Sequence, residues 1–303
     1  MTLDPDHISD RRRLARRLSF WRVVAVLAVA GALLALYARF DHLPGESYVA
    51  RYDVTGIILD DRLRDAALDA IAEDDDARAL ILRIDSPGGT VAGGEALYHS
   101  LRRVADKKPV VAVMGEVAAS AGYMTAIAAD RVLARAATVT GSIGVLMQSA
   151  DITGLLDKLG IKAESIKSSP LKAQPNPLEP LSPEAREANR ATVLDMYDMF
   201  VDMVAERRAM PRDKVLALAD GRVYTGRQAV ANGLADAIGG EREARDWLAQ
   251  EHGIDRETPI HDVEIDDEDR VWRRMMESIG GKTLFSERLN LDGLVSLWHP
   301  EIR

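Results

Sequence analysis

A serine within a run of small residues is the first candidate for chemistry in this 303-residue chain. Ser120 follows an apolar run and stands near the predicted start of a helix. The free amides and the dipole of a helix N-terminus favour an activated hydroxyl and a developing oxyanion. An isolated serine at such a place more often serves only as a helix N-cap. Ser120 therefore qualifies as a nucleophile only if the chain also supplies oxyanion donors and a base.

A pair of glycines, Gly88 and Gly89, could present backbone N–H groups to such an oxyanion. They end the sequence Asp-Ser-Pro-Gly-Gly at residues 85–89, which follows another short apolar run and precedes a predicted helix. Glycine lets the backbone turn its amides toward a ligand. Because Pro-Gly-Gly is also a common turn sequence, the pair does not identify a site by itself.

The base that a serine nucleophile needs is predicted to be a lysine. Six histidines are scattered through the chain, and only His99, within a predicted helix, lies near these motifs, so a Ser-His-Asp triad has little support. A lysine must be neutral to act as a base, which costs about 1.4 kcal/mol for each unit that its pKa is lowered, so it should be desolvated and far from carboxylates. Lys172 has apolar neighbours and no acidic residue before Glu179. We predict Lys172 as the base, with Lys167 as second choice.

The elements that would position these residues alternate between strand and helix. Apolar runs with little polar alternation predict strands covered on both faces of a sheet. A loop with four prolines at 168–181 separates them from a helix of about 25 residues, for which Ser182 is the predicted N-cap and Pro183 the first residue. This order predicts an α/β fold with a mostly parallel sheet. The predicted strands are 48–59, 79–84, 109–114, 132–134 and 143–148, and the other predicted helices are 61–73, 91–106, 119–129, 211–219 and 226–234.

The N-terminal region predicts a membrane anchor. Residues 20–38 form an apolar stretch of 19 residues with one charge, Arg22, near its start. A helix of this length spans about 28 Å, close to the hydrocarbon thickness of a bilayer. Five arginines lie within the basic residues 1–19, so the positive-inside rule places the N-terminus in the cytoplasm and the remaining chain outside. The alternative, a cleaved signal peptide, has a shorter apolar core of about 7–15 residues and a small-residue cleavage site.

Composition excludes several other kinds of function. The net charge of −9 disfavours nucleic acid as a partner. The chain has no cysteine, and its histidines show no metal-binding spacing. We therefore expect no metal and no cofactor.

Taken together, the motifs resemble those of the signal peptide peptidase A family, which includes protease IV-like Ser–Lys peptidases. The resemblance covers residues 48–240. It implies a Clp protease/crotonase-like spiral of ββα units, preceded here by one N-terminal transmembrane helix. The motifs that carry it are Ser-Pro-Gly-Gly at 86–89, Met-Gly-x-x-Ala-Ala-Ser-x-Gly-Tyr at 114–123, Ala-Asp at 129–130, Thr-Gly-Ser-Ile-Gly-Val at 140–145, Ser-Pro-Leu-Lys at 169–172, Val-Tyr-Thr-Gly at 223–226 and Gly-Leu-Ala-Asp at 233–236.

The resemblance also implies roles for individual residues. Ser120 matches the family's nucleophile, Lys172 its base, and Ser142 the serine that hydrogen-bonds the lysine. The oxyanion donors would be the amide of Gly88 or Gly89 together with that of Ala121. The family often has glycine at the position of Ala121, but alanine keeps the amide donor.

Residues 39–47 would be a linker, residues 48–240 the peptidase domain and residues 241–303 a helical or irregular extension. We expect a single-pass protein of a bacterial inner membrane whose extracytoplasmic domain hydrolyses residual signal peptides or other hydrophobic segments. The resemblance implies a homo-oligomeric ring, an octamer being one option, in which neighbouring subunits complete each site. The alternatives are a stomatin-associated type of membrane peptidase, a crotonase-like acyl-CoA enzyme and a catalytically silent scaffold.

Overall fold

The computed structural model describes residues 20–32, 47–263, 265 and 294–297. The chain divides into two units, Met1–Glu46 and Ser47–Arg303. In the first unit, residues 20–32 form a helix whose side chains are exposed and largely hydrophobic. The rest of the predicted membrane segment, residues 33–38, lies outside the described residues, as do residues 1–19 and most of the predicted linker. Among the helices that can be described, none is long and apolar enough to span a bilayer.

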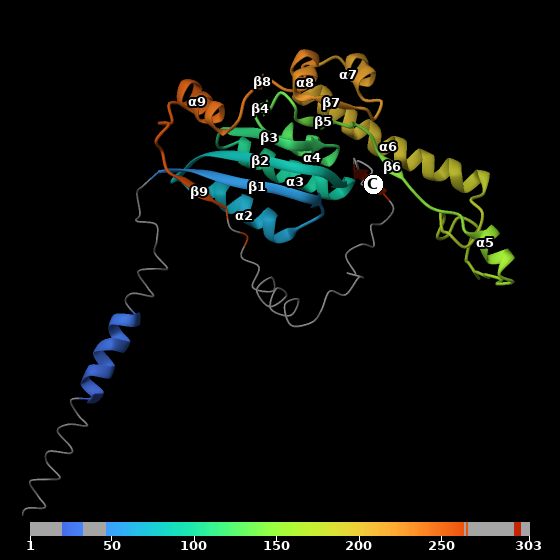
Figure 1. The fold of residues 1–303 in the computed structure, drawn as a ribbon, viewed down its shortest axis with the longest axis horizontal. Coiled ribbons are helices and arrows are strands. Elements are labelled where there is room, and N and C mark those ends of the chain that lie inside the picture. The colour runs from blue at the N-terminus through green and yellow to red at the C-terminus, as the bar shows by residue number, and fades with distance from the viewer. Residues whose placement is uncertain (1–19, 33–46, 264, 266–293, 298–303) are drawn as a thin grey trace, which may run out of the picture. The chain divides into compact units, whose positions relative to one another are not determined.

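The second unit is built on a sheet that has ten strands within the described residues. Its centre is parallel: β1 (Tyr48–Ile58), β2 (Ala77–Thr90), β3 (Val110–Ala119) and β4 (Arg131–Ala134) pair in this order, and β8 (Ala237–Ile238) pairs with β4. Short strands extend this centre on several sides (Figure 1). They are β5 (Val139–Gly141), β6 (Leu146–Met147), β7 (Val223–Thr225), β9 (Ile260–Asp262) and β10 (Leu294–Leu297).

The sheet is mixed, because β7 runs antiparallel to β5 and β10 runs antiparallel to both β2 and β6. The predicted α/β class is confirmed. Each antiparallel pair contains a short strand from outside the centre, where a segment distant in sequence returns to the sheet. These segments are too short, or too irregular in sequence, to show a strand pattern of their own.

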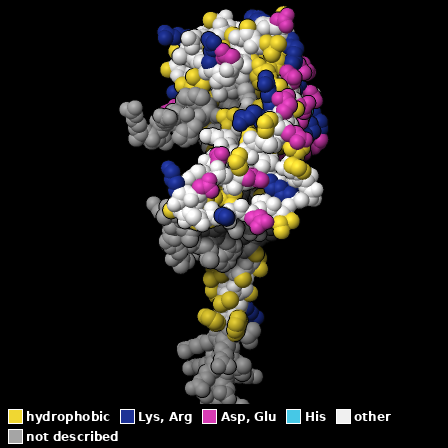
Figure 2. All heavy atoms as spheres, turned by 90° about the vertical axis from the view of Figure 1, so that its right-hand side faces the viewer, with side chains coloured by type: hydrophobic (Ala, Val, Ile, Leu, Met, Phe, Trp, Pro, Cys, Tyr) yellow, Lys and Arg dark blue, Asp and Glu magenta, His cyan; other side chains and the backbone are white. Residues whose placement is uncertain are grey.

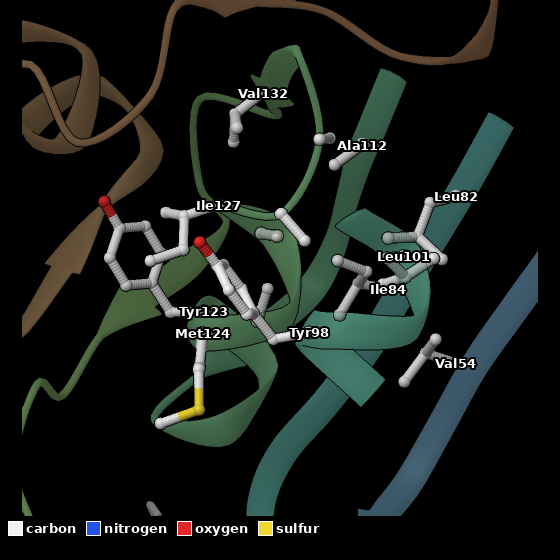
Figure 3. Packing of buried hydrophobic residues seen from close by; sticks show 14 of the residues in the cluster. Val54, Leu82, Ile84, Tyr98, Leu101, Ala112, Tyr123, Met124, Ile127 and Val132 are labelled. Carbon is white, nitrogen blue, oxygen red and sulfur yellow. The ribbon is translucent and has the colours of Figure 1, made fainter. Parts of the chain in front are cut away.

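Helices cover both faces of the central strands, which explains their apolar runs. On one face, Leu82 and Ile84 pack with residues of α3 (Val91–Ala105) and α4 (Ala121–Ala126), as Figure 3 shows. On the other face, Ile81 and its neighbours pack against α9 (Glu241–His252). Successive strand residues point to opposite faces, so each run supplies both cores. The remaining helices are α2 (Arg62–Glu73), α5 (Thr153–Lys158), α6 (Pro183–Arg207), α7 (Arg212–Leu218) and α8 (Gly226–Asn232).

Local capping signals place several helices where they were predicted. The hydroxyl of Ser182 accepts a hydrogen bond from the amide of Ala185, and α6 begins at Pro183 and has 25 residues, as expected. Asp61 caps α2 through the amides of Leu63 and Arg64. These caps depend on residues within one turn, which makes them visible in sequence.

Three element predictions near the site were wrong in their bounds. The glycine pair is part of β2 and not a turn after it. The strand predicted at 143–148 is replaced by β5 at 139–141 and β6 at 146–147. The helix predicted at 119–129 is the six-residue α4. It ends early because side chains from elsewhere bind the next carbonyls: Arg207 donates to the oxygens of residues 127 and 129, and Arg102 to that of residue 128.

Between β6 and α6, residues 148–181 form a largely exposed segment, called the arm below. It contains α5 and the proline-rich loop, which has no helix, as predicted. Figure 1 shows the arm leaving the sheet beyond β6 and returning to α6.

Candidate active site

Ser120 stands at a sharp turn between β3 and α4. The last residues of β3 pair with β5, and the amide of Ser120 donates to the carbonyl of Gly141 at 2.8 Å. At Ser120 itself the backbone has φ 57° and ψ −119°. The residue is 1% exposed, and its side chain forms no hydrogen bond that caps α4. The structure therefore argues against a simple N-cap role.

Backbone strain marks the predicted site. Within the part of the chain that the structure describes, only four residues other than glycine have positive φ, and they are Ser120, Ser142, Ala173 and Ala209. Two are predicted site residues, and Ala173 follows Lys172. Such conformations cost about 1–3 kcal/mol and cluster at active sites. A strained strand-to-helix turn that carries a serine is also how nucleophile elbows are built.

The start of α4 is held closely against neighbouring backbone. A Cβ atom on Gly122 would lie 2.8 Å from the carbonyl oxygen of Ser86, and one on Gly94 would lie 2.9 Å from the Cβ atom of Ala121. Ala121 is helical and is not among the residues with positive φ. Alanine therefore introduces no backbone strain at this position. With only six residues, α4 gives the helix-dipole argument less weight than the strained turn.

The glycine pair lies in the neighbouring strand. Ser86 of β2 pairs with Ala118 of β3, which places the segment beside the turn at Ser120. Gly88 has φ 118°, and its amide donates to Ser86 Oγ at 3.1 Å. A Cβ atom on Gly89 would collide with the carbonyl of Ile58, so β1 approaches too closely for any other residue there. The structure thus brings the predicted oxyanion segment next to the predicted nucleophile.

Ser142 lies beside Ser120. It follows Gly141, whose carbonyl accepts from the Ser120 amide, and its own amide donates to the carbonyl of Arg222 at 2.9 Å. A Cβ atom on Gly141 would collide with the ring of Tyr224, so β5 and β7 pack closely at this point. The turn that carries Ser142, with φ 50°, is therefore held from two sides.

Lys172 is separate from this group. It is exposed on the arm and lines a cavity of about 600 Å³ together with residues 165–168, 173 and 176–178, a lining to which Ser120 does not contribute. Lys167 lines the same cavity but forms an ion pair with Glu179, which also accepts from Asn176. The Lys167 amine is therefore engaged by a carboxylate, and the structure disfavours Lys167 as a base.

Other residues of the sequence motifs have structural roles. The Tyr123 hydroxyl donates to the carbonyl of Leu234 at 2.9 Å, and burial raises the pKa of this tyrosine. Asp236 accepts from the amide of Val132 at 2.6 Å and from Arg208 at 2.6 Å. These contacts join the motif at 233–236 to α4 and β4. Ser86 was not assigned a role from the sequence. Its hydroxyl bonds to Gly56 and Gly88 could not be predicted without knowing how the strands pair.

The sequence matches the description of peptidase family S49 over residues 102–255. It is 38% identical over 229 residues to a putative protease, slr0021, of Synechocystis, a match that covers 75% of this chain and 82% of that protein. The chain belongs to peptidase family S49. It is thus a signal-peptide-peptidase-like serine peptidase by family, and the resemblance found in its motifs is confirmed. The S49 match contains Ser120, Ala121, Ser142 and Lys172.

This chain matches only part of the length of several relatives. The chloroplastic serine protease SPPA of Arabidopsis thaliana is 34% identical over 75% of this chain and 33% of its own length. The putative signal peptide peptidase SppA of Enterococcus faecium is 36% identical over 64% of this chain and 56% of its own length. Among solved structures, a mutant of ClpP1 from Listeria monocytogenes matches with a TM-score of 0.44 and 16% identity, over 64% of this chain and 92% of that chain.

Proposed function

We propose that this S49 peptidase is a Ser–Lys endopeptidase in which Ser120 is the nucleophile and Lys172 the general base. The observation that carries the proposal is the strained turn at Ser120, beside the glycine segment and Ser142. This turn, which lies within the S49 match, combines a buried serine with an adjacent helical amide at Ala121. The glycine-bearing strand β2 lies beside it. We also propose the finer fold description, a Clp protease/crotonase-like spiral, for the second unit.

The proposed reaction proceeds in two stages. Ser120 Oγ attacks the peptide carbonyl while the neutral Lys172 amine takes its proton, and the amides of Ala121 and of Gly88 or Gly89 stabilise the oxyanion. The lysine then gives this proton to the leaving amine, which leaves an acyl-enzyme. Lys172 then deprotonates a water molecule, which attacks the ester. The protonated lysine returns this proton to Ser120 Oγ as the carboxylic acid product leaves. The hydroxyl of Ser142 would hold the lysine nitrogen in place by accepting from it or donating to it.

We propose that a second copy of the chain brings Lys172 to Ser120. In one chain the lysine is exposed on the arm, whereas Ser120 is buried at the end of β3. The arm carries exposed apolar side chains, including Ile166, which is 98% exposed. Figure 2 shows hydrophobic side chains among charged ones on the face of the molecule that includes the arm. A homo-oligomeric ring would cover these side chains and desolvate the lysine.

The proposed substrates are extended, hydrophobic peptides such as residual signal peptides. Strand β10 supports this binding mode, because it pairs antiparallel with β2 at Gly88, Gly89 and Thr90, next to the proposed oxyanion segment. A substrate strand could add to the same edge through main-chain hydrogen bonds. Ile57 of β1 and Leu146 of β6 are exposed on strands that flank this edge and would favour apolar substrate side chains. A stomatin-associated type of peptidase would use the same geometry with a different substrate.

The proposed location is the outer face of a bacterial inner membrane. It is supported by the arginines before the apolar stretch 20–38, of which residues 20–32 are helical. An extracytoplasmic domain would also exclude a crotonase-like role, because acyl-CoA is cytosolic. Reporter enzymes fused after residue 60 should be active only outside the cytoplasm. Activity of the same fusions in the cytoplasm would contradict this orientation.

Peptide hydrolysis by dyad variants tests the proposed chemistry. Ser120→Ala and Lys172→Ala should each lower kcat by at least about 10³-fold, and Lys172→Arg should be equally inactive because guanidinium keeps its proton. Ser142→Ala should retain part of the activity, since it removes an orienting group. Wild-type activity should rise with pH as the lysine amine loses its proton.

Lys167→Ala is the matched control, because Lys167 lies in the same cavity but is paired with Glu179. It should leave kcat largely intact. A result in which Lys167→Ala is inactive and Lys172→Ala is active would reassign the base. If both lysine variants stay active and a histidine variant fails, the Ser–Lys mechanism is wrong.

A further inference from the structure

Ser86 lies in β2, two residues before Gly88, and its hydroxyl joins the backbone at Gly88 to the backbone of β1. The residue is 0% exposed. Its Oγ donates to the carbonyl of Gly56 at 2.6 Å and accepts from the amide of Gly88 at 3.1 Å. A hydroxyl has one hydrogen, so the short bond to Gly56 uses it and the lone pairs remain for Gly88. One side chain therefore holds the backbones of two strands.

This bond occurs where the strand pairing is irregular. The register of β1 with β2 shifts between Thr55 and Ile57, and that of β2 with β3 shifts between Ile84 and Ser86. Register shifts interrupt the ladder and leave backbone groups that need other partners. The Ser86 hydroxyl supplies one for the carbonyl of Gly56 and one for the amide of Gly88. It does so immediately before the backbone takes the φ of 118° at Gly88.

Ser86 also contacts the element that carries the nucleophile. Its carbonyl oxygen faces Gly122 so closely that a Cβ atom there would lie 2.8 Å away. Its strand partner, Ala118, is two residues before Ser120. Ser86 thus has backbone contacts on the nucleophile side and hydroxyl contacts on the oxyanion side.

We propose that Ser86 is a positioning residue. It holds the Gly88–Gly89 peptide where the amide of this peptide can bind the oxyanion formed at Ser120. The proposal rests on the proposed Ser–Lys function. In the substrate-free structure the Gly88 amide is directed to Ser86, so the hydroxyl acts on the backbone of the oxyanion segment and not on the reacting atoms. Its loss should weaken stabilisation of the tetrahedral oxyanion and leave ground-state peptide binding nearly unchanged.

The test compares two ligands on the assembled full-length protein. A peptide boronate forms a tetrahedral adduct with the nucleophile, whereas the peptide amide of the same sequence binds without reaction. Ser86→Ala should lower kcat and boronate affinity by about tenfold or more, with KM and peptide affinity close to wild type. Ser86→Cys, of similar size and with a weak donor, should recover part of the loss, and it carries the comparison if Ser86→Ala does not fold.

Ser100→Ala is the matched control. Ser100 is also buried, and its hydroxyl accepts a hydrogen bond from Arg103 within α3. If Ser86→Ala changes the boronate-to-peptide affinity ratio no more than Ser100→Ala does, the role of Ser86 is only structural and the proposal is overturned. If wild type and Ser120→Ala bind the boronate equally, the proposed nucleophile is wrong, and the inference about Ser86 fails with it.

Discussion

At the residue scale, the backbone of Ser120 shows how the site depends on distant contacts. A run of small residues after an apolar strand made Ser120 a candidate, and the resemblance of the motifs assigned it as the nucleophile. Its φ of 57° was not predictable, because the amide is held by Gly141 and α4 is held against Ser86. The strain at Ser142 has the same kind of cause, since its amide is bound by the carbonyl of Arg222. Residue types identified the candidates, and tertiary contacts determine their geometry.

Replacement of Ser120 by glycine should therefore stabilise the fold while abolishing hydrolysis. Strain at this conformation costs a non-glycine residue about 1–3 kcal/mol, and glycine loses about 0.5–1 kcal/mol through the greater freedom of its unfolded chain. Ser120→Gly should be more stable than Ser120→Ala by about 1 kcal/mol. Both variants lack the hydroxyl, so denaturant unfolding of the pair measures the difference in stability that comes from the backbone. Equal stability, or a more stable alanine variant, would mean that the turn is unstrained.

At the element scale, elements that local interactions determine were predicted well, and elements that long-range contacts determine were not. Helix α6 was predicted closely because Ser182 and Pro183 specify its start locally. Helix α4 was predicted too long because Arg102 and Arg207, far away in sequence, bind the carbonyls that follow it. The three-residue strand β5 depends on pairing with β3 and β7, and the three-residue strand β7 on pairing with β5. Such strands have no pattern that a sequence window can detect.

The start of β1 should contribute a pH-dependent part of the stability. The Tyr48 hydroxyl donates to Asp74 Oδ2 at 2.7 Å, at the C-cap of α2. This hydrogen bond is the largest of the effects that hold the pKa of Asp74 below its usual range. Because the folded pKa is lowered, the stabilisation is fully present above the unfolded pKa of about 3.9 and is lost as the pH falls through the folded pKa. Tyr48→Phe should therefore cost about 1 kcal/mol at pH 7 and less in acid.

Tyr197→Phe is the control for this prediction. Its hydroxyl donates to the carbonyl of Ala219 at 2.7 Å, an acceptor that does not titrate. Denaturant unfolding from pH 7 to pH 3 should show a shrinking difference from wild type for Tyr48→Phe and a constant one for Tyr197→Phe. A constant difference for both variants would show that Asp74 does not contribute through its charge.

At the scale of the whole molecule, the arm presents exposed apolar side chains that the proposed neighbouring subunit would cover. Its prolines were recognised in the sequence as an extended loop, but the exposure of its apolar side chains was not predictable. Burying one isoleucine contributes about 1.5–3 kcal/mol, so a subunit that covers Ile166 would make the free energy of association more favourable. Ile166→Glu should shift the full-length protein to smaller species in light scattering and lower its activity. Ile238→Glu, at an exposed isoleucine of β8, should change neither, and equal effects of both variants would contradict a specific role for the arm.

The central claim, a Ser120–Lys172 dyad shared between subunits, is tested most directly by mixing two inactive variants. Ser120→Ala keeps an intact Lys172, and Lys172→Ala keeps an intact Ser120. After dissociation and reassembly of an equal mixture, half of the sites have the serine and half of those receive the lysine from a neighbour, so activity should recover to about a quarter of wild type. Each variant treated alone should stay inactive. A reassembled mixture as inactive as its two components would contradict the shared dyad.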